Sequence, residues 1–115
     1  MLFRSSDWIV TTGPANYVRD ATISACRRAG FSPRIAAEAD EFAVTQGYVA
    51  ASLGVAFVPL LALGAVREQV VVRRLKTPPE ARHIWVATRP AVATDPAVAS
   101  MINALRHAAR AALRS

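Results

Sequence analysis

The order of residues that is most informative about the fold is DEFAVTQGYVAASLGVAFVPLL, residues 40–61. Two acids come first, a segment of helical character follows, Leu53-Gly54 interrupts it, and a β-branched run closes at Pro59. A helix, a stop and a strand in that order form one α-to-β unit of an open α/β sheet. Sheets of this kind bind ligands at the carboxyl ends of their strands. The segment therefore predicts a ligand-binding module.

The same reasoning extends to both sides of this segment. Short β-prone runs predict strands over residues 8–11, 33–37, 55–58, 70–75 and 83–88. Apolar residues at helical spacing predict helices over residues 17–29, 41–52 and 96–114, with one or two helical turns over 60–65. The order β-α-β-α-β with short links predicts an α/β fold, in which an open, mostly parallel sheet has a βαβαβ core and a C-terminal helix follows.

The ends of the predicted helices carry recognisable signals. Gly30 supplies a stop for the first helix, and Asp40 is the expected N-cap of the second. Gly54 is expected to take a positive φ where the second helix stops, so Gly54→Val should destabilise the chain. The second helix is expected to bury Phe42, Thr45, Val49 and Leu53.

Composition limits the class of protein. At 115 residues the chain is one domain at most. Lys and Arg number 14 against 8 Asp and Glu, which gives a net charge of +6 and suggests either nucleic-acid contact or scattered, solvated arginines. Cys26 is alone, so it forms no intramolecular disulfide and is expected to be a buried thiol. The N-terminus lacks the apolar region of a secretory signal, and we expect a cytoplasmic protein.

A membrane span is the alternative for the uncharged residues 42–66, which are long enough to cross a bilayer. Polar and helix-breaking residues interrupt this segment at Gln46, Gly47, Gly54, Pro59 and Gly64. The aromatic and basic flanks of a span are also missing. A buried helix, turn and strand is therefore the prediction, with no membrane association.

Two strand-to-helix turns are the candidate ligand contacts. Thr11, Thr12 and Gly13, followed by Pro14, offer two hydroxyls and free backbone N–H groups, which suit a carboxylate or phosphate. The equivalent turn of the next unit consists of Asp40, Glu41 and Phe42, which offers backbone N–H groups and an aromatic wall. The competing interpretation is structural, because many such turns only connect elements, with Asp40 as a cap and Phe42 in the core.

No catalytic or metal-binding motif accompanies these turns. The chain has no G-x-S-x-G, Walker or G-x-G-x-x-G motif, and no pairing of a nucleophile with a base. His83 and His107, with the single cysteine, do not have metal-ligand spacing. We therefore predict neither an enzyme, nor a metal site, nor a cofactor.

Several segments, taken in their order along the chain, resemble the LysR-type transcriptional regulators, and in particular the carboxy-terminal part of their effector-binding region. The first three are WIVT (8–11), ACRRAGFSPRIAAEADEF (25–42) and VAASLGVAFVP (49–59). The tail continues the likeness with VVVRRL (70–75), a proline-containing loop, HIWVATR (83–89) and DPAVASMINALR (95–106). Each piece is generic, but their order and spacing are specific, and together they span residue 8 to about residue 108.

The resemblance implies the fold of a type II periplasmic binding protein, in which two α/β subdomains hold a small molecule between them. This chain would be a single, partial effector-binding domain: residues 8–75 would form the second subdomain, and residues 82–115 a return strand and closing helix. The cleft-facing turns of the family match Thr11, Thr12 and Gly13, and then Asp40, Glu41 and Phe42. The implied partner is a small anionic effector that shifts the population of two subdomain arrangements.

The family's winged helix-turn-helix, linker helix and first subdomain have no counterpart in these 115 residues. We therefore expect a regulatory fragment that contacts DNA only through a missing N-terminal domain. The apolar face of the last helix is expected to be exposed or to self-associate, giving a dimer. The alternative functions are a freestanding basic α/β protein that binds nucleic acid and a remnant without activity.

Overall fold

Two parallel strands form the centre of the fold. The computed structural model describes residues 3–13, 16–77, 79 and 81–114. Strand β1 (Asp7–Thr11) pairs with strand β2 (Arg34–Ala39), and a register shift between Trp8 and Ile9 accommodates one extra residue of β2. On its other side β1 meets Val55, whose N–H donates to the Asp7 carbonyl and whose carbonyl accepts from the Ile9 N–H, both at 2.9 Å. The α/β fold with a parallel sheet is confirmed.

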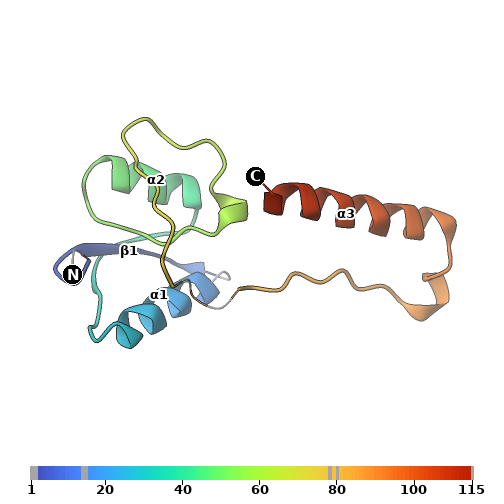
Figure 1. Cartoon of the computed structure of the whole chain (residues 1–115), viewed down its shortest axis with the longest axis horizontal. Coiled ribbons are helices and arrows are strands. Elements are labelled where there is room, and N and C mark those ends of the chain that lie inside the picture. The colour runs from blue at the N-terminus through green and yellow to red at the C-terminus, as the bar shows by residue number, and fades with distance from the viewer. Residues whose placement is uncertain (1–2, 14–15, 78, 80, 115) are drawn as a thin grey trace. The chain divides into compact units, whose positions relative to one another are not determined.

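Helices cover both faces of β1. Helix α1 (Asn16–Arg28) and helix α2 (Phe42–Ala50) both pack against this strand and lie on opposite sides of it in Figure 1. Residues 8–11 are consequently all buried, as expected for a strand enclosed on two faces. Burying one such aliphatic side chain contributes roughly 2 kcal/mol. The run WIVT therefore has apolar side chains at three successive positions, followed by Thr11, instead of alternating polar and apolar residues.

Three predicted strands differ from the structure. The strand predicted over 55–58 is reduced to the single bridge at Val55, and neither 70–75 nor 83–88 is a strand. Their β-branched composition favours extended backbone, but a strand also needs a neighbour with which to share hydrogen bonds. Within the described part of the chain these two segments pair with no other segment, and apolar side chains in them, such as Val71 and Ile84, are exposed.

Both helices of the sheet end in the same hydrogen-bond pattern. At the end of α1, the Phe31 N–H donates to the Cys26 carbonyl and the Gly30 N–H to the Arg27 carbonyl, with Gly30 at φ +87°. At the end of α2, the Leu53 N–H donates to the Tyr48 carbonyl and the Ser52 N–H donates to the Val49 carbonyl. This is the Schellman arrangement, which requires a left-handed residue. Gly30 confirms its predicted role, whereas Ser52, at φ +63°, holds that position in α2.

The expected positive φ at Gly54 is therefore wrong, because the left-handed residue precedes it by two positions. Gly54 serves a different purpose: a Cβ placed on it would lie 2.5 Å from the Asp7 carbonyl oxygen. The glycine allows the backbone after α2 to approach β1 closely enough to pair with it. Leu53, expected to be buried, is instead about half exposed, because the Schellman turn directs it outward from the sheet.

Ser52→Gly is expected to raise the free energy of unfolding by up to about 1 kcal/mol. A left-handed residue with a Cβ costs roughly 1–2 kcal/mol, and glycine removes that cost while adding some entropy to the unfolded chain. Thermal unfolding followed by circular dichroism measures the change. Ala51→Gly is the control, because Ala51 has φ −80° and gains nothing from glycine. Equal effects of the two substitutions would contradict the left-handed turn.

Gln46 fixes the loop that follows η2 (Leu60–Ala62). This amide is buried in α2, where its Nε2 donates to the Leu63 carbonyl at 2.9 Å and its Oε1 accepts from the Arg67 N–H at 3.2 Å. A buried amide with both ends bonded is stable in an apolar surrounding. The polar residue that interrupts the uncharged run therefore anchors a loop to a helix.

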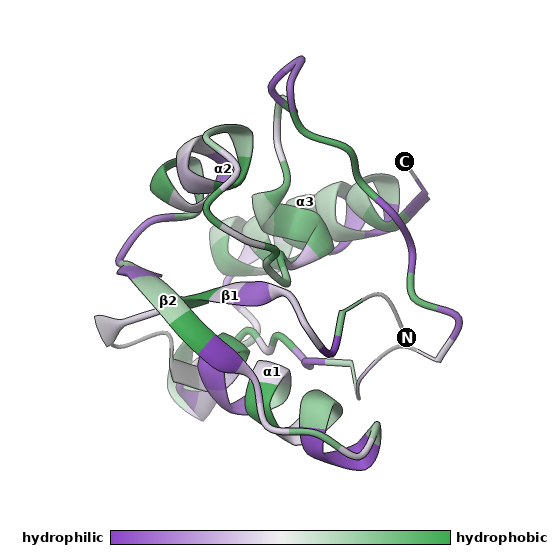
Figure 2. Ribbon diagram, turned by 90° about the vertical axis from the view of Figure 1, so that its left-hand side faces the viewer, coloured by the Kyte–Doolittle hydropathy of each residue, from purple (hydrophilic) through white to green (hydrophobic). Residues whose placement is uncertain are grey.

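The chain forms two compact units, residues 1–80 and 81–115. In the second unit, an extended segment leads to η3 (Pro90–Val92) and then to helix α3 (Pro96–Arg114), coloured orange to red in Figure 1. The Asp95 carboxylate accepts from the Ala97 N–H at 2.8 Å, so Asp95 is the N-cap of α3, and Pro96 is its first residue. Helix α3 is amphipathic (Figure 2), with Met101, Leu105 and Leu113 exposed.

Candidate functional site

The two predicted turns lie side by side at the carboxyl edge of the sheet. Strands β1 and β2 run parallel and end opposite each other, Thr11 facing Ala39. One further hydrogen bond extends the ladder, from the Thr12 N–H to the Ala39 carbonyl at 2.9 Å. The structure therefore brings residues 11–13 and residues 40–42 to the same edge. Helices α1 and α2 both begin here, so their N–H groups point toward this edge.

The first turn passes from buried to exposed within three residues. Thr11 is 3% exposed, Thr12 is half-buried, and Gly13 is exposed with φ +80°. A Cβ on Gly13 would meet nothing within 4 Å, so this glycine provides its backbone conformation and not a close approach. Pro14, predicted to complete the turn, lies outside the described residues.

The Thr11 hydroxyl has an exceptional environment. Three threonines are almost fully buried, and two of them direct the hydroxyl to the carbonyl four residues earlier: Thr22 to Val18 at 2.7 Å and Thr45 to Glu41 at 3.2 Å. The Oγ1 atom of Thr11 is buried without a hydrogen-bond partner among the described residues. An unsatisfied buried polar group costs roughly 1–3 kcal/mol, so its position beside the candidate site calls for an explanation.

The second turn is more exposed than the first. Asp40 and Glu41 both face solvent, and Phe42 is half-buried as the first residue of α2. The N-cap is Glu41, with φ −129° and ψ 145°, and its side chain forms no capping hydrogen bond. The predicted N-cap role of Asp40 is therefore wrong by one residue. Because neither carboxylate bonds the helix terminus, the N–H groups of the first turn of α2 receive no side-chain cap.

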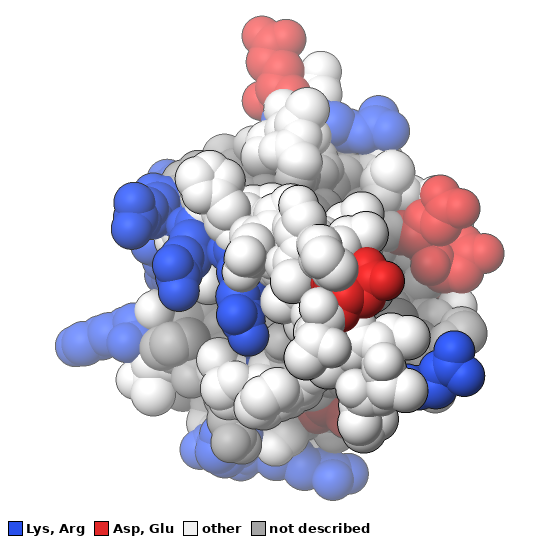
Figure 3. All heavy atoms as spheres, turned by 90° about the vertical axis from the view of Figure 1, so that its right-hand side faces the viewer, with Lys and Arg blue, Asp and Glu red and all other residues white. Residues whose placement is uncertain are grey.

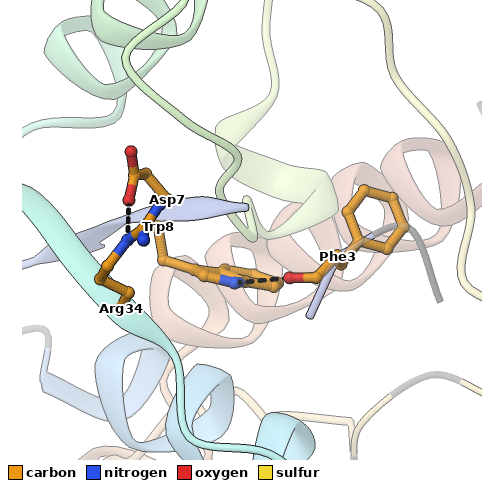
Figure 4. Close-up of polar contacts among 4 residues, drawn as sticks. All are labelled: Phe3, Asp7, Trp8 and Arg34. Atoms are coloured by element: carbon orange, nitrogen blue, oxygen red, sulfur yellow. Dashed lines mark hydrogen bonds and ion pairs between the residues drawn. The ribbon is translucent and has the colours of Figure 1, made fainter. Parts of the chain in front are cut away.

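The opposite edge of the sheet holds an aromatic cluster that sequence reasoning missed. Trp8 packs edge-on against Phe57 with ring centroids 5.3 Å apart, and Phe3 and Phe31 lie 6.3 and 6.4 Å from its indole. The Trp8 Nε1–H donates to the Phe3 carbonyl at 3.2 Å (Figure 4). An ion pair between Asp7 and Arg34 joins β1 to β2 nearby. The sequence signal was an aromatic residue within or just before each of three predicted strands, at positions 8, 31 and 57.

Metal binding and membrane crossing find no candidate among the described residues. None of them form a group of three or more His, Cys, Asp or Glu side chains able to hold a metal ion. No helix among them has the length and hydropathy needed to cross a membrane. Cys26 is buried as expected, and burial raises the pKa of its thiol. Acidic as well as basic side chains occur on the face shown in Figure 3, with uncharged residues between them.

A parallel sheet with two adjacent turns at its carboxyl edge is the arrangement at which open α/β domains bind ligands. The chain matches the LysR substrate binding domain over residues 3–110, and it belongs to that family. The resemblance seen in the sequence is thereby confirmed, together with the type II periplasmic-binding-protein fold of the family. No curated protein and no solved structure matches the chain significantly.

Domains of this family belong to regulators and bind effectors, which gives the chain an effector-binding, regulatory role. The alternative of a freestanding nucleic-acid-binding protein finds no support in these comparisons.

Proposed function

We propose that this chain binds a small organic anion at the edge formed by Thr11, Thr12 and Gly13 together with Asp40, Glu41 and Phe42. The observation that carries the proposal is the juxtaposition of these two turns in a LysR substrate binding domain, secured by the bond from Thr12 to Ala39. The role is regulatory and not catalytic, it requires no cofactor, and it is exercised in the cytoplasm. We assign DNA contact to none of the described residues.

The two turns differ in charge, and this difference orients the ligand. The first turn carries the hydroxyls of Thr11 and Thr12 and no charge, and α1 begins nearby, although the Thr12 N–H, predicted to be free, already donates to the Ala39 carbonyl. An anionic group is favoured there, because a helix N-terminus attracts negative charge. The second turn carries the exposed carboxylates of Asp40 and Glu41. We therefore place hydroxyl or amino groups of the effector at the second turn.

The proposed mechanism is a population shift. Residues 8–75 act as one subdomain of the effector-binding domain, and residues 82–115 act as its return segment and closing helix. An effector that binds one arrangement of subdomains more tightly shifts the equilibrium toward it, and the shift alters how subunits pack. The apolar face of α3 is the proposed self-association surface of a dimer, since Met101, Leu105 and Leu113 are exposed.

Thr11→Val tests the site directly. Valine has nearly the shape of threonine but lacks the unpartnered hydroxyl, so the free energy of unfolding should stay equal or rise by about 1 kcal/mol. Binding should weaken, because the hydroxyl is then missing where the anionic group binds. Acetate and inorganic phosphate serve as probes, and amide chemical shifts of Thr12, Gly13 and Phe42 during NMR titration report binding.

Thr22→Val is the matched control. Its hydroxyl is bonded to the Val18 carbonyl, so the same substitution should lower stability by about 1 kcal/mol and leave the titration unchanged. The proposed site would be contradicted if the probes caused no chemical-shift changes at the carboxyl edge of the parent chain. It would also be contradicted if Thr11→Val left those changes unaltered.

Self-association is tested by charge on α3. Val98→Asp and Leu105→Asp each place a carboxylate on the apolar stripe, and each should lower the mass measured by light scattering toward that of a monomer, since burying an unpaired charge is costly. Ser100→Asp adds the same charge to the opposite side of the helix and should leave the mass unchanged. If all three variants keep the parent mass, the stripe is not the contact.

A further inference from the structure

A small hollow lies at the amino ends of the strands, at the edge of the sheet opposite the candidate site. The residues that line it include the four aromatic residues Phe3, Trp8, Phe31 and Phe57, and also Cys26 of α1. The volume is about 170 Å³. All of the residues that line it belong to the unit of residues 1–80. The hollow is therefore a feature of the folded α/β unit itself.

Size and lining define what the hollow accepts. An apolar cavity of about 150 Å³ in another protein takes up benzene, so a volume of this order holds one aromatic ring. Trp8 and Phe57 already stand edge to face with centroids 5.3 Å apart, and Phe31 is tilted by 40° to Trp8. A flat ring placed among them gains edge-to-face and stacked contacts beyond the burial of its area.

Charge at the rim defines the second property of the ligand. Arg4 lines the hollow and is exposed, with its guanidinium carbon 5.8 Å from the centroid of the Phe31 ring and its Nη2 3.5 Å from the Ala29 carbonyl oxygen. The long Arg4–Ala29 hydrogen bond is weak, so the guanidinium retains donors for another acceptor. None of the described residues that line the hollow is acidic. A carboxylate beside the ring would therefore meet a cation and no opposing charge.

We infer that this hollow is a second small-molecule site, for a single-ring aromatic carboxylate whose ring lies among Trp8, Phe31 and Phe57 and whose carboxylate faces Arg4. The site is separate from the proposed effector edge, because Trp8 and Thr11 stand near opposite ends of β1. The inference does not rest on the proposed function. A ligand here would contact the strand that carries Thr11 at its other end.

The test uses benzoate as the probe and Trp8 as the reporter. The chain has two tryptophans, so Trp85→Phe leaves Trp8 as the sole indole fluorophore. A probe of about nine non-hydrogen atoms should bind with a Kd of about 1 mM, changing the emission of Trp8. Benzyl alcohol is the neutral counterpart. Arg4→Gln should weaken benzoate about tenfold and leave benzyl alcohol unchanged, because only benzoate has a charge to pair.

Filling the hollow provides the matched pair of variants. Ala25 lines the hollow, so Ala25→Leu should weaken the binding of both probes about tenfold or more. Ala21 lies one turn earlier on α1 and outside this hollow, so Ala21→Leu should leave the binding of both probes unchanged. Thr11→Val should leave benzoate affinity unchanged, which separates this site from the effector edge. Unaltered affinity in a folded Ala25→Leu chain, or equal loss of both probes in Arg4→Gln, would overturn the assignment.

A second measurement needs no substitution. Nuclear Overhauser effects between the ring protons of benzoate and the indole protons of Trp8 are expected in the parent chain. If benzoate shows effects only to Trp85, or none to Trp8 at saturation, the hollow is not its site.

Discussion

Gly54→Val is expected to lower the free energy of unfolding by about 3 kcal/mol or more, a large fraction of the stability of a chain this small. The added Cβ would lie 2.5 Å from the Asp7 carbonyl oxygen and 2.9 Å from its carbonyl carbon. Both neighbours are backbone atoms of the central strand, so neither can rotate away. The same oxygen accepts one of the two hydrogen bonds that join Val55 to β1, so displacing the backbone at Gly54 would also weaken that pairing.

Thermal or urea unfolding followed by circular dichroism measures this loss. Gly54→Ala adds only the Cβ and should show most of it. Gly47→Ala is the matched control, because Gly47 lies inside α2 and its Cβ would meet only the end of Arg67, at 3.7 Å. Alanine in a helix is favoured over glycine, so Gly47→Ala should stabilise by about 1 kcal/mol. An unaltered unfolding midpoint in Gly54→Ala would show that the chain passes β1 at a greater distance.

Trp8→Ala is expected to cost about 4 kcal/mol. The indole is 3% exposed and contacts three other aromatic rings, so its removal empties the centre of the cluster and leaves a cavity beside the central strand. The carbonyl of Phe3 also loses the indole N–H and keeps only the longer hydrogen bond from the Ser6 N–H. Trp8→Phe keeps most of the packing but removes the N–H, and should cost less than Trp8→Ala.

Trp85→Ala is the control for the loss of an indole. Trp85 is 85% exposed in the extended segment before η3, so its replacement should change the free energy of unfolding by less than about 0.5 kcal/mol. Urea unfolding monitored by circular dichroism serves for both variants, since it does not depend on tryptophan emission. If Trp8→Ala lowered the free energy of unfolding as little as Trp85→Ala does, the packed aromatic cluster would be contradicted.

Much of the fold follows from patterns within short windows. The run WIVT predicted β1, the spacing of apolar residues predicted α1 and α3, and Gly30 predicted the end of α1. These signals are local, because a helix period, a cap or a left-handed residue depends on neighbours within about one turn. The adjacency of the two candidate turns was also predictable, since parallel strands joined by right-handed crossovers end at one edge of the sheet.

The remaining features depend on atoms far apart in the sequence. Composition favours extended backbone at 70–75 and 83–88, yet a strand forms only where a second segment completes its hydrogen bonds. The constraint on Gly54 comes from Asp7, forty-seven positions earlier in the chain, and no local pattern records that contact. The same holds for the hydroxyl of Thr11, which is buried without a hydrogen-bond partner among the described residues, and for the aromatic hollow around Trp8.

Sequence alone therefore identified the α/β class, the order of its central elements and the two turns that form the candidate ligand-binding edge, because these are properties of local periodicity and chain direction. The folded chain decided which segments pair, why Gly54 must be glycine and where the aromatic hollow lies, because each of these requires two surfaces to meet at van der Waals distance.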